Sequence, residues 1–83
     1  MSDYELVPMS GLELDRNDYR TNLEYYQKLS RLTTTQMSER SRVNVRTLRY
    51  LIAGYRDINQ TSALTVYNLA TVLNCTVEDL LEK

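Results

Sequence analysis

Arginine is the residue type in this chain whose placement could do chemistry. Residues 31–56 hold six arginines against one acidic residue, Glu39, although the whole chain of 83 residues has a formal net charge of −1. The planar guanidinium group binds phosphate or guanine through two parallel hydrogen bonds. A nucleic-acid duplex responds to the local face more than to total charge, so we expect such an interface here. The alternative is a solvated, charged helix surface.

Other chemistries lack the residues that they need. The chain contains no histidine and one cysteine, Cys75, which removes histidine-based acid–base catalysis, ordinary zinc sites and an intrachain disulfide. Without a neighbouring base, Cys75 is interpreted as a small buried hydrophobic residue. No stretch approaches the ~18 apolar residues of a membrane span, and residues 1–10 lack the features of a signal peptide. We expect a cytoplasmic protein that is not an enzyme and uses no cofactor or metal.

Four of these arginines lie on residues 33–54, a segment whose sequence predicts two short helices joined by a tight turn. Thr33 is a suitable N-cap for a helix over residues 34–41, because its hydroxyl can accept a backbone N–H that has no intrahelical partner. Asn44 can cap a second helix over residues 45–53 in the same way. The segment is therefore expected to present two helices at a fixed angle.

The second of these helices has an apolar side and a basic side. Leu48, Leu51 and Ile52 share one face by the three-and-four spacing. Gly54 follows where the end of a helix favours a residue with positive φ. The apolar face is expected to pack on a core, which leaves the other faces to solvent. Those faces carry Arg46, Arg49 and Tyr50.

Three further helices are expected from capping residues and apolar spacing. One runs from about residue 17 or 18 to residue 30, one covers residues 63–73 after a Ser62 cap, and a short one follows Thr76. Asn74 takes a helix-ending position for which Asn is second to glycine. The expected core residues are Leu23, Tyr26 and Leu29 or Ser30, then Val66, Leu69, Ala70 and Leu73, then Val77, Leu80 and Leu81.

The motif resembles the phage-repressor-like helix-turn-helix family, also called the Cro/repressor or XRE family. The run LATVLNCTVEDLLE is similar to the end of the family's domain, so the resemblance covers about residues 20–82. It implies an all-α, five-helix, phage-repressor-like DNA-binding domain over residues 18–83, after a flexible or extended N-terminal arm over residues 1–17. The matching motif residues are Leu32, Thr33, Met37, Ser38, Ser41, Val43, Thr47, Leu48, Leu51 and Gly54.

The resemblance also implies which residues meet DNA. In the family the second motif helix lies in the major groove, and its N-terminal residues meet base edges. Arg46 is the strongest candidate, as a bidentate donor to guanine, and Val45 would contact a thymine methyl group. The implied base contacts are Asn44, Val45, Arg46 and Tyr50, and the implied phosphate contacts are Thr34, Thr35, Gln36, Arg49 and Arg56, followed by Arg42 and Arg40.

The chain departs from the family pattern at three positions. Position 42 usually holds glycine, and arginine there costs ~1 kcal/mol if the same left-handed geometry is kept. Either the turn has another shape, or Arg42 has another use, such as a phosphate contact. Ile52 replaces a common Glu, and Thr34 replaces a Gln that contacts the DNA backbone.

The function implied by the resemblance is sequence-specific binding of double-stranded DNA by a transcriptional repressor or autoregulator, acting as a homodimer on a palindromic operator. The dimer surface is expected on the C-terminal helix, with Ile58 or exposed tyrosines. The competing hypothesis is a protein-interaction module on the same fold, such as an antitoxin-type or cofactor protein, with exposed Ile52 and Tyr55 as docking residues. The N-terminal arm is either a mobile tail or an arm that pairs across a dimer or docks on another protein, folding as it binds.

Overall fold

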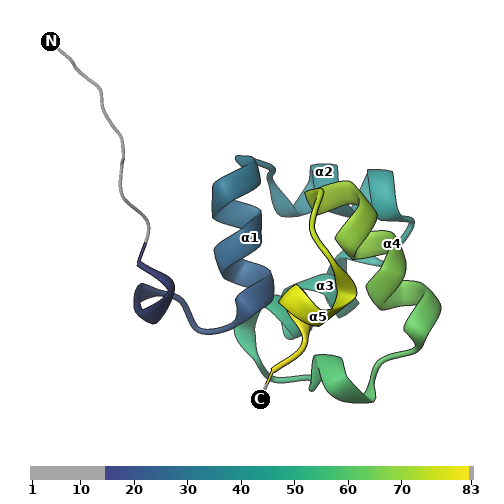
Figure 1. Cartoon of the computed structure of the whole chain (residues 1–83). Helices are drawn as coiled ribbons and strands as arrows, with labels where there is room; N and C mark the ends of the chain where they lie inside the picture. The colour runs from purple at the N-terminus through teal and green to yellow at the C-terminus, as the bar shows by residue number, and fades with distance from the viewer. Residues whose placement is uncertain (1–14, 83) are drawn as a thin grey trace, which may run out of the picture.

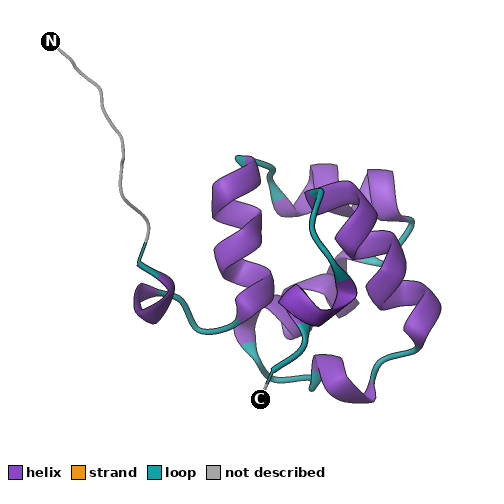
Figure 2. Ribbon diagram, in the orientation of Figure 1, coloured by secondary structure: helices purple, strands orange, loops and turns teal. Residues whose placement is uncertain are grey.

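The computed structural model describes residues 15–82, and its regular elements in that range are all helical, with no strand (Figures 1 and 2). None of these helices is long and apolar enough to cross a bilayer. The predicted arm lies mostly outside the described residues. The elements are a 3-10 turn η1 (Arg16–Asp18), α1 (Asn22–Ser30), α2 (Thr34–Ser41), α3 (Val45–Ala53), a 3-10 turn η2 (Ile58–Gln60), α4 (Ala63–Leu73) and α5 (Val77–Leu80).

Capping side chains fix where the motif helices begin. Thr33 Oγ1 accepts the N–H of Gln36 at 3.1 Å, and Gln36 Oε1 accepts the N–H of Thr33 at 2.9 Å, which forms a reciprocal capping box at α2. Asn44 Oδ1 accepts an N–H from the first turn of α3 at 2.8 Å. Ser62 and Thr76 cap α4 and α5. The predicted bounds of α2, α3 and α4 are confirmed.

Helices α1 to α4 end on residues in the left-handed region, which redirects the chain and lets the next N–H groups reach the last carbonyls. This ending was predicted at Gly54 and Asn74 and is confirmed at both. It was not predicted at Arg31, which ends α1 with φ 58°. The left-handed residues are Arg31, Arg42, Gly54 and Asn74.

The first helix begins later than predicted. Its N-cap is Thr21, whose Oγ1 accepts the N–H of Glu24 at 3.1 Å, so the predicted start near Asn17 or Asp18 is wrong. The preceding acidic residues serve a separate element, because Asp15 caps η1. The two stretches are joined by extended backbone and do not form one helix.

Contacts distant in sequence select this start. Thr21 Oγ1 also donates to the carbonyl oxygen of Ile52 at 2.8 Å, at the end of α3. The carboxylate of Glu82 accepts the N–H of Asn22. Capping propensity alone ranks Asn17 and Asp18 slightly above Thr21, so the tertiary contacts decide.

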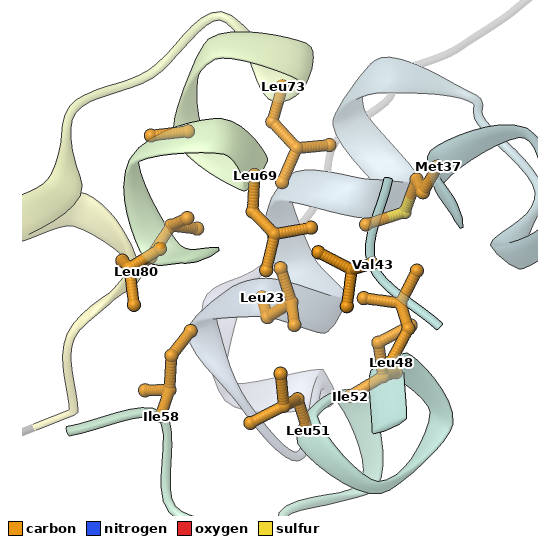
Figure 3. Close-up of a cluster of buried hydrophobic side chains, with 12 residues drawn as sticks. Leu23, Met37, Val43, Leu48, Leu51, Ile52, Ile58, Leu69, Leu73 and Leu80 are labelled. Atoms are coloured by element: carbon orange, nitrogen blue, oxygen red, sulfur yellow. The ribbon is translucent and has the colours of Figure 1, made fainter. Parts of the chain in front are cut away.

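The core is one cluster of twelve buried hydrophobic residues to which every α-helix contributes (Figure 3). Leu48 of α3 and Leu69 of α4 are completely enclosed. The predicted inward residues of α4 are confirmed. The cluster consists of Leu23, Met37, Val43, Leu48, Leu51, Ile52, Ile58, Val66, Leu69, Ala70, Leu73 and Leu80.

The core face of α1 differs from the prediction. Leu29 is 46% exposed, and the buried position one turn after Leu23 belongs to Gln27. Burying an amide is favourable only when its polar atoms are bonded. Gln27 Nε2 meets this condition by donating to the carbonyl oxygen of Leu32 at 3.1 Å and to Thr34 Oγ1 at 3.2 Å.

Two isoleucines expected at docking or dimer surfaces are core residues. Ile52 and Ile58 are both buried in the hydrophobic cluster. Ile52 completes the apolar face of α3 with Leu48 and Leu51, and η2 turns Ile58 inward after the loop that follows Gly54. Neither residue is available to a partner, so that part of the prediction is wrong.

The end of the described chain is held against its beginning by a group that we call the C-terminal clasp: Arg16, Asn22, Asn59, Leu81 and Glu82. Arg16 Nη2 lies 3.3 Å from Glu82 Oε1, and Asn22 Nδ2 donates to the carbonyl oxygen of Leu81 at 2.8 Å. Glu82 N–H donates to Asn59 Oδ1 at 2.9 Å, and Asn59 Nδ2 donates back to the Glu82 carbonyl oxygen. The clasp joins three segments that are far apart in sequence.

Cys75 is half-buried and packs against the edge of the core, so the prediction of full burial is only partly met. Removal of the thiol from water, with a smaller contribution from the Asp79 carboxylate, raises the pKa of Cys75 to about 11.

Alkylation of Cys75 by iodoacetamide is therefore expected to be slow in the native protein. At pH 8 an ordinary thiol of pKa ~8.5 is about a quarter thiolate, whereas a thiol of pKa ~11 is about one part in a thousand. We expect the native rate to be on the order of 100-fold below the rate in urea, and to rise about tenfold per pH unit up to about pH 10. Equal rates in native and unfolded protein would contradict this burial.

Candidate nucleic-acid interface

The basic side of α3 is exposed because its apolar side is fixed on the core. Leu48 and Leu51 are enclosed by the other helices, and the opposite side of α3 carries exposed Arg46, Arg49 and Tyr50. Docking through several buried side chains holds the orientation of a nine-residue helix. The predicted separation of an inward and an outward face is confirmed.

The residues at the start of α3 differ in what they leave free. Arg46 is exposed, and Val45 is half-buried. Asn44 is exposed, but its Oδ1 is engaged in the helix cap, so its Nδ2 group is the part available to a ligand. This end of the helix therefore presents donors to an approaching molecule.

At the start of α2, part of the predicted donor set serves the fold. Thr34 is half-buried, and its Oγ1 accepts from Gln27. Gln36 is exposed, with its Oε1 held by the capping box. Thr35 is exposed, and its hydroxyl takes no part in the cap of α2. The Thr35 hydroxyl and the Gln36 amide nitrogen are free to meet a phosphate, and the half-buried Thr34 hydroxyl keeps its O–H as a donor because it only accepts from Gln27.

The turn between α2 and α3 keeps the left-handed geometry that favours glycine. Arg42 has φ 64° and ψ 25°, and its N–H donates to the carbonyl oxygen of Ser38 at 2.8 Å. Ser41 Oγ donates to the carbonyl oxygen of Met37 at 2.6 Å, and the Ser38 hydroxyl donates to the carbonyl oxygen of Val43. The turn is held by these bonds, and the arginine adopts the strained conformation within it.

Substitution of Arg42 by glycine is expected to raise the free energy of unfolding by up to ~1 kcal/mol. The relief of left-handed strain, ~1–2 kcal/mol, exceeds the ~0.4–1 kcal/mol that glycine adds to the entropy of the unfolded chain. Arg40→Gly is the matched control, because it removes the same charge from within α2 and is expected to lose ~1 kcal/mol. Urea denaturation measures both variants. A loss in both would contradict strain at Arg42.

The arginines of the motif are not neutralised by the described part of the chain. Within residues 15–82 the ion pairs join Arg16 to Glu82 and Arg20 to Glu24. The charges left without a described carboxylate partner therefore act on solvent and on any approaching anion. In residues 31–56 they are Arg31, Arg40, Arg42, Arg46, Arg49 and Arg56.

Two surface grooves gather several of these residues. The first, about 730 Å³, lies between the turn before α3 and the start of α4, and brings Arg42, Asn44 and Arg56 together with several hydroxyl groups. Arg46 lines neither this groove nor the second, and stands on the exposed surface of α3. We call the second the tyrosine groove; it has a volume of about 330 Å³ and is lined by Arg20, Thr34, Arg49, Tyr50, Ile52, Ala53 and Tyr55.

Two residues of the tyrosine groove were not predicted as part of this interface. Arg20 precedes α1 and belongs to no motif, so its place beside Arg49 follows only from the tertiary fold. Tyr55 was expected at a protein-docking surface. It is 84% exposed, and its ring meets that of Tyr50 edge to face, with centroids 6.5 Å apart.

No family model matches this chain, and neither does any curated protein or solved structure. Within residues 15–82, no three His, Cys, Asp or Glu side chains gather in a group that could hold a metal ion. The features that distinguish this surface are thus its arginines, its hydroxyl and amide donors and its two exposed tyrosines.

Proposed function

We propose that this protein is a transcriptional regulator that binds double-stranded DNA in a sequence-specific manner, on a helix-turn-helix of the phage-repressor-like type. The observation that carries the proposal is α3, a helix anchored by Leu48 and Leu51 that turns Arg46 and Arg49 to solvent without a described counter-charge. A rigidly held helix with free guanidinium groups fits the major groove in width and in chemistry.

In the proposed complex the contacts divide into two kinds. Arg46, with Asn44, Val45 and Tyr50, meets base edges in the major groove. Arg46 is the specificity residue because its guanidinium can donate twice to one guanine. The phosphate contacts come from the start of α2, from Arg49, and from Arg42 and Arg56 at the groove on the other side of the turn. Bound in this way, the protein would act as a repressor or autoregulator.

We further propose that the protein binds its operator as a homodimer, because one helix of this length reads too few base pairs for useful specificity. Exposed side chains on α4 support a contact between copies: Leu64 and Tyr67 are among the most exposed large hydrophobic residues. Single exposed residues are common on monomers, so the mass of the complex on a duplex is the direct measurement. A complex with one chain per operator would contradict the dimer.

The DNA contacts are tested with duplexes selected from a random pool. Arg46→Ala is expected to weaken the selected duplex by ~1–3 kcal/mol and to remove the preference at one base step. Arg56→Ala is expected to weaken every duplex alike and to reduce the slope of log affinity against log salt by about 1. Lys28→Ala removes the same charge on α1 and serves as control. If Arg46→Ala weakened every duplex equally, Arg46 would be a phosphate contact, which would contradict its assigned role in reading a base.

The second candidate function is a protein-interaction module on the same fold. It is favoured by the exposure of Tyr55, Leu64 and Tyr67, which are 84%, 69% and 60% exposed. Apolar rings and side chains of this kind are typical anchors of protein interfaces. Salt separates the two candidates, because duplex binding weakens steeply with salt and an apolar protein contact does not.

A further inference from the structure

The tyrosine groove is an unfilled apolar surface with charged edges. Its lining includes Ala53 and the small exposed part of Ile52, together with the edge-to-face pair of Tyr50 and Tyr55. Tyr50 and Tyr55 are both among the exposed large hydrophobic residues. These two exposed rings, which share a groove with Ala53, leave a surface that an apolar segment could cover.

The charges at the edge of this groove favour an acidic occupant. Arg20 is directed by Glu24, whose carboxylate accepts the Arg20 N–H at 2.8 Å and the guanidinium at 2.7 Å. Arg49 has no ion pair with any of residues 15–82. A carboxylate lying in the groove would find an unneutralised guanidinium there, together with the Thr34 hydroxyl.

The sequence outside the described range has the complementary composition. Residues 1–14 contain three acidic residues and no lysine or arginine. Glu13 lies between Leu12 and Leu14 in that stretch, so one short segment carries a carboxylate with an apolar side chain on each side. This combination matches a groove that has an arginine at its edge and aromatic rings on its wall.

The connection to the described chain is short. Arg20 is itself a lining residue of the groove, and it follows Asp15 by five residues. Five residues span at most ~18 Å, so the segment that ends at residue 14 is joined to the described chain within reach of this groove. A second copy is a poorer occupant, because a symmetric contact through this groove would bring Arg20 and Arg49 against the same charges of the other chain.

We propose that residues 1–14 bind the tyrosine groove of their own chain, with Glu13 toward Arg49 and with Leu12 and Leu14 against the tyrosine rings. Thr34, Arg49 and Tyr50 line this groove and are also proposed DNA contacts. The segment and a duplex then compete for the same surface, and the segment lowers the DNA affinity of the free protein. This consequence rests on the proposed function, whereas the docking itself does not.

Docking is tested without DNA by paramagnetic broadening in the full chain. A nitroxide is attached at position 10 of a Ser10→Cys/Cys75→Ala chain, and the amide signals are compared with the reduced label. We expect broadening concentrated at Arg20, Thr34, Arg49, Tyr50 and Tyr55. A label at position 78 of Glu78→Cys/Cys75→Ala is the control, because α5 does not line this groove. Uniform weak broadening from position 10 would overturn the proposal.

A mixed sample identifies the chain to which the segment belongs. When the label is on one set of molecules and the isotope on another, docking within one chain predicts no broadening at the groove. Broadening in the mixed sample equal to that in the doubly labelled sample would show a second copy as the occupant and would overturn the proposal.

The regulatory consequence is tested with a single charge change that needs no label. Glu13→Gln is expected to shift the amide signals of the groove and to raise duplex affinity about threefold or more. Glu78→Gln makes the same change in net charge on α5, and is expected to leave the affinity within about 1.5-fold. An equal gain in duplex affinity from both variants would mean that net charge alone explains the gain, and would contradict competition between the segment and the duplex. If no variant binds any duplex, the proposed function fails, while the broadening still decides the docking.

Discussion

Replacement of Leu48 by alanine is expected to lower the free energy of unfolding by ~2–5 kcal/mol, the range for a fully buried leucine. Leu48 is completely enclosed and belongs to the buried core cluster (Figure 3). The cost combines the lost burial of the side chain with the cavity that remains. Small domains hold stabilities toward the low end of ~5–15 kcal/mol, so this one change removes much of the total and loosens α3.

Urea denaturation followed by circular dichroism measures this loss. Leu64→Ala is the matched control, because the same atoms are removed from a side chain that is 69% exposed. Its expected effect is within about 0.5 kcal/mol. Similar losses in the two variants would contradict the position of Leu48 in the core.

Replacement of Thr21 by valine is expected to cost ~2–4 kcal/mol, although the two side chains have nearly the same shape. Thr21 is buried, and its hydroxyl makes two bonds: it accepts the N–H of Glu24 at 3.1 Å and donates to the carbonyl oxygen of Ile52 at 2.8 Å. Loss of an N-cap costs ~1 kcal/mol, and a buried carbonyl left without a donor costs ~1–3 kcal/mol. The single hydroxyl therefore begins one helix and completes the end of another.

Two controls separate these contributions. Thr21→Ser keeps the hydroxyl, so most of the stability should remain. Thr33→Val removes an N-cap of the same kind at an exposed residue. The Thr33 hydroxyl makes no bond besides the cap, so the change is expected to cost only ~1 kcal/mol. Equal losses from Thr21→Val and Thr33→Val, measured by thermal or urea unfolding, would show that the bond to Ile52 contributes nothing.

The parts of the fold that could be predicted are those fixed by neighbours in sequence. Thr33, Asn44 and Ser62 cap helices within three residues of their own position, and Gly54 and Asn74 end helices through their own backbone freedom. The apolar faces of α3 and α4 could likewise be predicted from the spacing of residues within each helix alone. These local signals placed α2, α3 and α4 correctly.

The parts that could not be predicted depend on contacts distant in sequence. The start of α1 follows from bonds that Thr21 and Asn22 make to residues near the ends of α3 and of the described chain. Gln27 is buried because Leu32 and Thr34 satisfy its amide. Ile58 is buried because η2 turns it inward, which no periodicity reveals over three residues.

The same division holds for the candidate interface. The exposure of Arg46, Arg49 and Tyr50 follows from the apolar spacing of one helix. The tyrosine groove was not predictable, because it needs Arg20 from before α1 beside Arg49 of α3. A groove formed by segments about thirty residues apart leaves no pattern within either segment.

The C-terminal clasp has a consequence for where the chain could be opened without loss of the fold. Arg16 Nη2 lies 3.3 Å from Glu82 Oε1, and the hydrogen bonds around this pair connect α1, η2 and the last described residues. The clasp therefore couples the first and last segments of the described range, and loss of the Glu82 contacts would weaken the hold on both. A covalent linker between them would replace the clasp with a peptide, and the chain could then be opened elsewhere. A circular permutant with new ends in the loop between α3 and η2, where residues 54–57 are all exposed, is expected to keep the fold.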